Sequence, residues 1–274
     1  MSVPNVPNWI RIILVIASVL SFAPQLNRTI SRRNSTGIST RYVLLNLIST
    51  TEQFALTFYF IVNHFDAPDF FVRSPKNAGD WINLVQMSVV LILWLTFFVV
   101  CLYLPSEHRD CSVKVAVGIY VAFLLISVVP VFADAIKPGS HEERQWTLAL
   151  FFGIHSLFLS WIITALNVAA IYYQVRETLS QPQNTALSRV GLATQAIIFG
   201  ILAISWIGRV RFPFEGFAER FWGLLSTWYE LVGWAAVDTG VFALGQAFIL
   251  WKVSRQAVLG SGAFHGETEP LLHA

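Results

Sequence analysis

Seven stretches of mainly apolar residues, joined by short polar segments, constrain the fold of this chain more than any other feature of its sequence. Each approaches the roughly 20 residues that an α-helix needs to cross the hydrocarbon core of a bilayer. Hydrophobic residues make up 55% of the chain and charged residues only 12%, whereas soluble domains carry about 25% charged residues. The sequence therefore predicts an all-α integral membrane protein. The seven expected spans are 9–25, 42–63, 82–104, 113–132, 147–173, 187–207 and 228–251.

An odd number of spans puts the two termini on opposite sides of the membrane. Lys and Arg decide which side is cytosolic, because they resist translocation, and the early segments usually dominate. The loop between the first two expected spans carries four arginines: Arg28, Arg32, Arg33 and Arg41. We therefore expect a lumenal or external N-terminus and a cytosolic C-terminus. The sequons at Asn27 and Asn34 lie in the same loop, so a glycan on either one would invert this orientation.

An internal repeat relates the end of the first span to the end of the fifth. A constant offset of 149 aligns residues 24–39 with 173–188 without a gap, and five positions are identical: Gln25/Gln174, Thr29/Thr178, Ser31/Ser180, Thr36/Thr185 and Ser39/Ser188. Five identities alone could arise by chance in a biased composition. Both copies, however, end a span and lead through a polar loop into the next one, and this shared position favours a duplication.

The four crossings between the two copies place both of them on the same side of the membrane. The sequence thus predicts two parallel three-helix repeats, 1–104 and 147–253, joined by a connector at 105–146 that holds the fourth helix, with a cytosolic tail at 254–274. Parallel repeats of this kind occur in secondary transporters, which hold the solute between the halves near the midplane.

The stretch from Ala23-Pro24-Gln25 to Gly37-Ile38-Ser39, partly repeated from Tyr173-Gln174, resembles the PQ-loop repeat proteins. This family includes cystinosin and the lysosomal and vacuolar basic amino-acid exporters, and it is more distantly similar to the SWEET sugar transporters and the KDEL receptor. The second motif departs from the family pattern, because Tyr173 replaces its proline and Ala186 replaces the glycine that Gly37 matches. If both prolines act as hinges in the family, only the first half of this chain retains one.

Pro24 and Gln25, with their counterparts Tyr173 and Gln174, are the predicted hinge elements. A proline inside a spanning helix removes one backbone hydrogen bond and kinks the helix, and neighbouring groups can satisfy the freed carbonyl where the site lines a cavity. The alternative is that the first helix simply ends near residue 25.

Two carboxylates, Glu52 and Asp238, lie well inside the expected spans. A charge at the centre of a bilayer costs at least about 2.5 kcal/mol, and neither residue has an obvious basic partner in its own helix. Asp238 also matches the acidic position in the last helix of the family. We therefore expect Asp238 to bind a proton or a substrate amine. Glu52 is a second candidate, with a structural hydrogen bond as the alternative, and His155 is read as a core histidine satisfied by a neighbouring helix.

Polar side chains at helical spacing are expected to line a hydrated pathway: Ser18, Ser21 and Gln25; Asn46, Ser49 and Gln53; Ser156, Ser160, Asn167 and Gln174; and Gln195, the counterpart of Asn46. The alternative is hydrogen bonding between packed helices, which is common in membrane bundles and contributes roughly 0.6 kcal/mol per contact.

Other classes of function have no support in the sequence. A net charge of +2 gives no basis for binding nucleic acid, which needs a dense basic surface. No nucleophile constellation, metal-ligand cluster or phosphate-binding glycine loop is visible, so we expect no enzyme activity, cofactor or metal. The tail residues Glu267, Leu271 and Leu272 resemble an acidic dileucine signal, which sorting adaptors recognise for delivery to lysosomes or vacuoles. The alternative is a disordered acidic tail.

The resemblance and these residues together predict proton-coupled export of an amino acid or a similar small polar solute from an acidic organelle to the cytosol. A non-transporting sorting or signalling receptor with the architecture of the KDEL receptor, and a sugar transporter of the SWEET type, are the alternatives.

Overall fold

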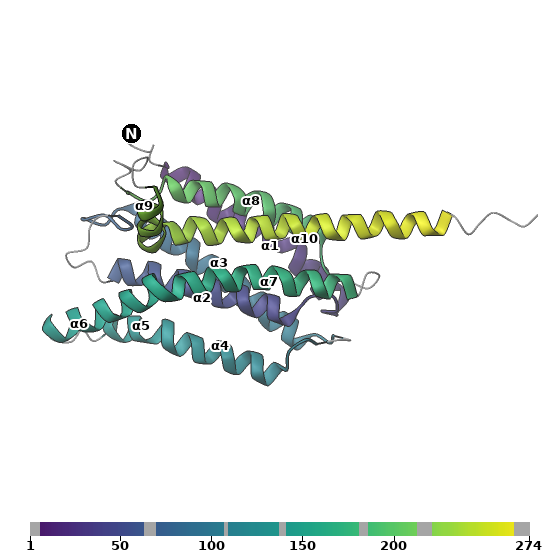
Figure 1. The fold of residues 1–274 in the computed structure, drawn as a ribbon, viewed down its shortest axis with the longest axis horizontal. Helices are drawn as coiled ribbons and strands as arrows, with labels where there is room; N and C mark the ends of the chain where they lie inside the picture. Colours follow the sequence, from purple (N-terminus) through teal and green to yellow (C-terminus); the bar gives the residue numbers. More distant parts are fainter. Residues whose placement is uncertain are drawn as a thin grey trace, which may run out of the picture.

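The structure is a computed structural model, and it describes residues 6–62, 70–106, 109–136, 141–180, 186–212 and 221–265. Within these ranges the regular secondary structure is helical (Figure 1). Two segments, labelled η, are π-helical. The elements in chain order are α1 (Asn8–Arg32), α2 (Thr40–Val62), α3 (Ala78–Tyr103), α4 (Val113–Ser127), α5 (Val129–Ile136), α6 (His141–Phe152), η1 (Gly153–Leu159), α7 (Ser160–Ser180), α8 (Arg189–Ile207), α9 (Phe221–Trp228), η2 (Tyr229–Gly233) and α10 (Trp234–His265).

Several elements follow one another directly and form longer helical runs, namely α4 with α5, α6 with η1 and α7, and α9 with η2 and α10. Six runs among the described residues are long and apolar enough to cross a membrane: Asn8–Arg32, Ala78–Tyr103, Val113–Ile136, Trp146–Ser180, Arg189–Ile207 and Trp222–Gln256. The chain is therefore a helical integral membrane protein, as its composition predicts.

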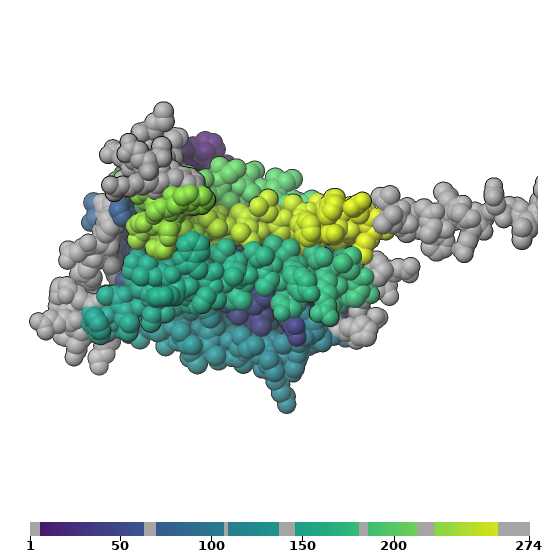
Figure 2. All heavy atoms as spheres, viewed as in Figure 1, coloured from purple at the N-terminus to yellow at the C-terminus, as the bar shows by residue number. Residues whose placement is uncertain are grey.

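Helix α2 is the remaining run, and polar residues fill its middle: Asn46, Ser49, Thr50, Thr51, Glu52 and Gln53. Most of α2 is buried, because α3 and α7 pack against it and α4 and α5 add further contacts. On the face seen in Figure 2, α7 and the α4–α5 segment leave only small patches of α2 visible. A helix surrounded by protein does not need an apolar surface facing lipid, so α2 can carry the polar groups of the interior.

Six helices form a closed ring in which α1 contacts α3 and α8, α10 contacts α8 and α7, and α2 contacts α7 and α3. The offset of 149 maps α1 onto α7, α2 onto α8 and α3 onto α10. Under this mapping the contacts of α3 with α1 and α2 correspond to those of α10 with α7 and α8. The two contacts between the halves, α1 with α8 and α2 with α7, correspond to each other. The packing therefore has the symmetry that two three-helix repeats require, and α4 lies outside the ring at the edge of the bundle (Figure 1).

Several helices extend beyond the apolar stretches that predict them. Helix α1 continues past Gln25 to Arg32, and α7 continues past Tyr173 to Ser180. The alternative that the first helix ends near residue 25 is therefore wrong. Apolar content marks the part of a helix that lies in the bilayer, whereas residues with good helix propensity continue the helix into water.

The predicted repeat boundaries shift for the same reason. Helix α6 begins at His141, inside the segment expected to be connector, and α10 runs to His265, well into the expected tail at 254–274. Pro130 interrupts the fourth span without ending it, since α4 stops at Ser127 and α5 resumes at Val129. Helix α10 extends beyond one end of the bundle (Figure 1).

Candidate functional site

Gln25 joins the end of α1 to the loop that precedes α8. Its Nε2 donates to the carbonyl oxygen of Ala186 at 3.2 Å, and its Oε1 accepts from the backbone N–H of Ser188 at 2.7 Å. The same Nε2 also donates to the hydroxyl of Thr29, one turn further along α1, at 3.0 Å. Because a glutamine amide supplies both a donor and an acceptor, one buried side chain satisfies two backbone groups of the other half.

Gln174 makes the same three contacts in the opposite direction. Its Nε2 donates to the carbonyl oxygen of Gly37 at 2.8 Å and to the hydroxyl of Thr178 at 3.2 Å, and its Oε1 accepts from the N–H of Ser39 at 3.1 Å. Subtracting the offset of 149 from 186 and 188 gives 37 and 39, so the two glutamines bind equivalent positions, each in the half opposite its own.

We call these contacts the glutamine clasp: the side chains of Gln25 and Gln174 with the backbone of residues 37, 39, 186 and 188. A further backbone bond, from the N–H of Ala186 to the carbonyl of Thr36 at 2.9 Å, runs beside it. The clasp ties the two halves together at the end of the bundle where α1 and α7 end.

Pro24 lies inside α1, where its missing N–H leaves the carbonyl four residues earlier without its helical partner. Tyr173, its counterpart, lies 5.1 Å beneath the guanidinium carbon of Arg41 at the start of α2. Both residues flank a clasp glutamine, and the hinge role stays a prediction. A cleft of about 390 Å³ opens beside Tyr173 and Arg41. Its lining consists of Arg41, Asp110, Tyr173, Arg176, Glu177 and Ser180.

A small cavity lies between the two halves, toward the middle of the bundle. Its volume is about 20 Å³, which is room for a single water molecule. Helices of both halves contribute to its wall. The lining residues are Asn46, Ser49, Thr50, Gln53, Val90, Trp94, Asn167, Phe199, Asp238, Thr239 and Phe242. The interior is thus polar on the side of α2 and α7, aromatic on the side of α3 and α8, and too small for a solute in this conformation.

Asp238 is the only ionisable side chain in that lining, and it is buried. Thr164 donates a hydrogen bond to its Oδ1, and the side chains of Gln53 and Asn167 also hydrogen-bond to the carboxylate. No basic side chain among the described residues forms an ion pair with Asp238. Tyr229 extends the network, because its hydroxyl lies 2.6 Å from that of Thr164.

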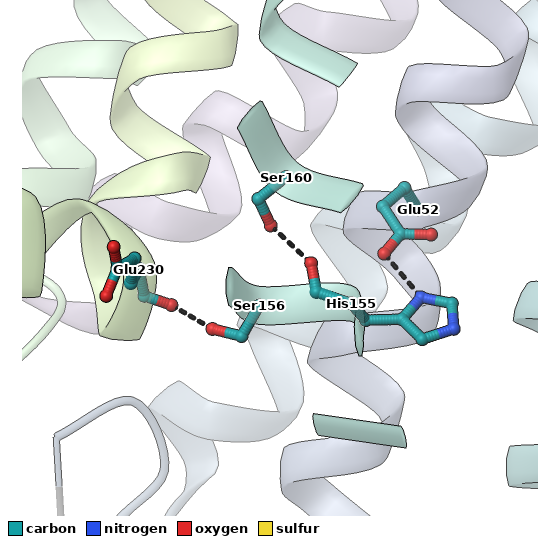
Figure 3. Close-up of polar contacts among 5 residues, drawn as sticks. All are labelled: Glu52, His155, Ser156, Ser160 and Glu230. Carbon is teal, nitrogen blue, oxygen red and sulfur yellow. Dashed lines mark hydrogen bonds and ion pairs between the residues drawn. The ribbon is translucent and has the colours of Figure 1, made fainter. Parts of the chain in front are cut away.

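Glu52 and His155 form a buried pair beside the cavity (Figure 3). The Oε1 of Glu52 lies 2.6 Å from the Nδ1 of His155, and the two side chains are 2% and 3% exposed. The imidazole also stacks on the ring of Phe151, with the centroids 3.9 Å apart. His155 is therefore a core histidine satisfied by a neighbouring helix, as expected. The two residues are 103 positions apart, a separation that carries no signal in the sequence.

Two π-helical segments, η1 and η2, pack against each other next to this pair. Ser156 in η1 donates to the backbone carbonyl of Glu230 in η2, and Ser160 donates to the carbonyl of His155 at 2.9 Å (Figure 3). A π-helical turn changes the register of the side chains that follow, and such turns are frequent at functional sites. Here η1 contains His155, and η2 comes directly before the helix that carries Asp238.

The remaining predicted residues are distributed between the interior and the helix contacts. Asn46 and Asn167 line the cavity, and Asn167 donates to the hydroxyl of Ser49 at 2.9 Å. Gln195 is buried in α8 but is not part of the lining. The hydroxyl of Ser18 accepts a hydrogen bond from Gln86 of α3 at 3.0 Å. This bond joins two packed helices, which is the alternative to a hydrated pathway. The dileucine residues Glu267, Leu271 and Leu272 lie outside the described residues.

Sequence reasoning missed Thr164, whose hydroxyl bonds to Asp238, and the aromatic residues Trp94 and Phe199 of the cavity wall. A threonine and two aromatic residues in apolar spans look like ordinary packing residues, so composition and spacing could not distinguish them.

The comparisons with known proteins agree with this arrangement. The family model of the PQ loop repeat matches residues 6–69, a range that contains α1, α2 and the loop between them, with half of the glutamine clasp. No curated protein matches the chain. This protein is therefore a helical membrane protein that carries a PQ-loop repeat in its first two helices.

Proposed function

We propose that this protein transports a small polar solute by alternating access, and that the solute binds in the interior around Asp238. The observation that carries the proposal is the small cavity between the two repeats, because its polar wall comes from both halves and contains a single carboxylate. Transporters built from parallel repeats hold their solute in this place.

The wall favours an amino acid or a similar zwitterion with a small side chain. In its protonated form the carboxyl group of Asp238 can donate a hydrogen bond to the carboxylate of the solute, and the amides of Asn46, Gln53 and Asn167 supply donors and acceptors for its other polar groups. Trp94 and Phe199 offer an apolar surface for the body of the solute. Since the present cavity holds only one water, the halves have to separate before a solute can enter.

Asp238 also supports coupling to protons. A carboxyl group without a basic partner can take up a proton when its surroundings change. In an acidic lumen Asp238 would be protonated and would hydrogen-bond to the solute as a neutral acid, and at the higher pH of the cytosol it would release both the proton and the solute. Transport would then run from the lumen of the organelle to the cytosol.

The glutamine clasp is the proposed gate at the end of the bundle that we assign to the cytosol. Its four bonds between the halves close the cavity from that side, at about 1 kcal/mol each. Water can replace these partners on opening, so the closed state is favoured by only a few kcal/mol. Pro24 would bend α1 as the clasp releases.

A metabolite comparison tests the function as a whole. Purified lysosomes or vacuoles from cells with and without the protein would be compared, and we expect one amino acid or a related solute to accumulate in its absence. That solute is then offered to proteoliposomes. Uptake confirms a transporter, whereas saturable binding without uptake would instead identify a receptor.

The proposed location is the lysosomal or vacuolar membrane, with sorting adaptors reading Glu267, Leu271 and Leu272. Changing both leucines to alanine should move a fluorescent fusion to the cell surface. Glycosylation tests the orientation. A sequon fused to the N-terminus should gain glycan, while the native Asn27 and Asn34 should not. A glycan on Asn27 or Asn34 would contradict a lumenal N-terminus.

A further inference from the structure

Two buried arginines meet at the end of the bundle opposite the glutamine clasp. Arg11 lies in the first turns of α1, and Arg209 follows the end of α8. Both donate to the same oxygen, the Oδ1 of Asn83 in α3, at 3.3 Å each. The three side chains are 1%, 2% and 1% exposed. Arg11 also donates to the backbone carbonyls of Val6 and Gly79, whereas Arg209 has only the neutral oxygen of Asn83 among the hydrogen-bond acceptors of the described residues.

Several donors around Asn83 and Arg209 have no partner in the part of the chain that the structure describes. They are the Nδ2 of Asn83, the Nε and Nη2 of Arg209, and the Nε1 of Trp206. These groups are neighbours, because Arg209 bonds to Asn83 and lies 4.7 Å from the ring of Trp206. All four atoms are N–H donors. Buried polar groups are rarely left without partners in native proteins, and each such loss costs stability.

Arg209 forms no ion pair with an acidic side chain among the described residues. The nearby carboxylate of Asp80 interacts with Arg11. One oxygen of Asp80 already accepts from the backbone N–H groups of Arg73 and Asn77. Burial and the neighbouring Arg11 lower the pKa of Arg209 to about 9, so its guanidinium is still protonated at neutral pH. An excess of buried donors with excess positive charge is the environment that an anion stabilises.

We propose that Arg209, Asn83 and Trp206 form a binding site for a small anion of the size of chloride. The near-complete burial of the three polar side chains favours a monatomic ion over a solute or a lipid headgroup. The ion accepts from the Nε and Nη2 of Arg209, from the amide of Asn83 and from the indole N–H of Trp206. It thereby holds the ends of α3 and α8 together at the end of the bundle that we assign to the lumen.

Thermal unfolding of the purified full-length protein in detergent tests this site. Sodium chloride is titrated against sodium gluconate at constant ionic strength, because gluconate is too large for a sealed site. We expect chloride to raise the Tm by a few degrees and the rise to saturate, as binding to the folded state alone requires. Radioactive chloride should bind at about one ion per chain in equilibrium dialysis.

Arg209→Met should abolish the chloride-dependent rise, whereas Arg211→Met, at an exposed arginine two residues further on, should leave it unchanged. If Arg209→Met does not fold, Asn83→Asp provides the second variant. Its carboxylate would lie between the two guanidinium groups and replace the ion, so its Tm should no longer depend on chloride.

Three results would overturn the proposal. The first is an equal Tm in chloride and gluconate. The second is a chloride effect that persists in Arg209→Met. The third is a rise with acetate or phosphate but not with chloride, which would assign the site to a carboxylate or a phosphate instead of a halide.

Discussion

The two halves of this molecule are alike where they meet at the glutamine clasp and differ in the interior. Gln25 and Gln174 make matching bonds to matching positions. In the interior the match ends, because the offset of 149 places Val89 opposite Asp238 and Ile201 opposite Glu52. The π-helical segments η1 and η2 both belong to the second half. The comparison shows that the two halves share the clasp, which we propose as the gate, and that the carboxylates of the proposed binding region belong to one half each.

The largest expected effect comes from the asymmetric interior. His155→Ala leaves Glu52 buried without its partner, and loss of one member of a buried pair typically costs about 3–5 kcal/mol. We expect the Tm of the purified protein to fall strongly. The double variant Glu52→Gln, His155→Gln should recover much of the loss, because two neutral amides can bond to each other. Ile201→Ala, at the lipid-facing counterpart of Glu52, is the matched control and should have a small effect. Additive losses in the double variant would show that the pair is not coupled.

The two glutamines of the clasp should contribute equally to the free energy of unfolding. Gln25→Ala and Gln174→Ala each remove three hydrogen bonds and leave backbone groups of the opposite loop unpaired, so each should cost about 2–3 kcal/mol. Denaturation of each single variant and of the double variant measures this. Equal losses would support the equivalence of the two halves. A silent Gln174→Ala beside a severe Gln25→Ala would mean that only the half with the proline carries the gate.

The contact of Tyr173 with Arg41 should contribute least. An exposed cation–π pair is worth about 0.5–1 kcal/mol, so Tyr173→Leu should lower stability by no more than that. A double-mutant cycle with Arg41→Gln measures the interaction energy between the two side chains. A coupling energy near zero would indicate that the tyrosine substitutes for the proline without gaining a new contact. A large one would show that it strengthens closure of the second half.

The helices and the duplication could be predicted from the sequence because both leave local patterns. Spans follow from apolar length, Ser188 marks the start of α8 as its N-cap, and the offset of 149 pairs Gln25 with Gln174. The crosswise direction of the clasp could not be predicted, since each glutamine bonds to backbone more than 130 residues away. Spacing within one helix says nothing about such contacts.

The interior residues could likewise be predicted only in part from the sequence. Asp238 and Glu52 could be found as carboxylates in apolar spans, because burial of charge is costly and therefore informative. Their partners could not. Thr164 and His155 reach them only through the packing of α7 and η1 against α10 and α2, and the π-helical turns that set the register have no recognisable pattern in the sequence.

Proton flux through Asp238 is the most direct test of the account. Wild-type protein and Asp238→Asn would be reconstituted in vesicles that contain a pH-sensitive dye, with Asp134→Asn on the peripheral α5 as the control. Amino acids, or the solute that accumulates in organelles, are then added under an imposed pH gradient.

We predict solute-dependent proton movement with the wild type and the control, and a loss of about tenfold or more with Asp238→Asn, as expected when one charge-assisted hydrogen bond of about 1.5–3 kcal/mol is removed. Unchanged proton movement and uptake in Asp238→Asn would contradict the central claim that this carboxylate couples the solute to the proton.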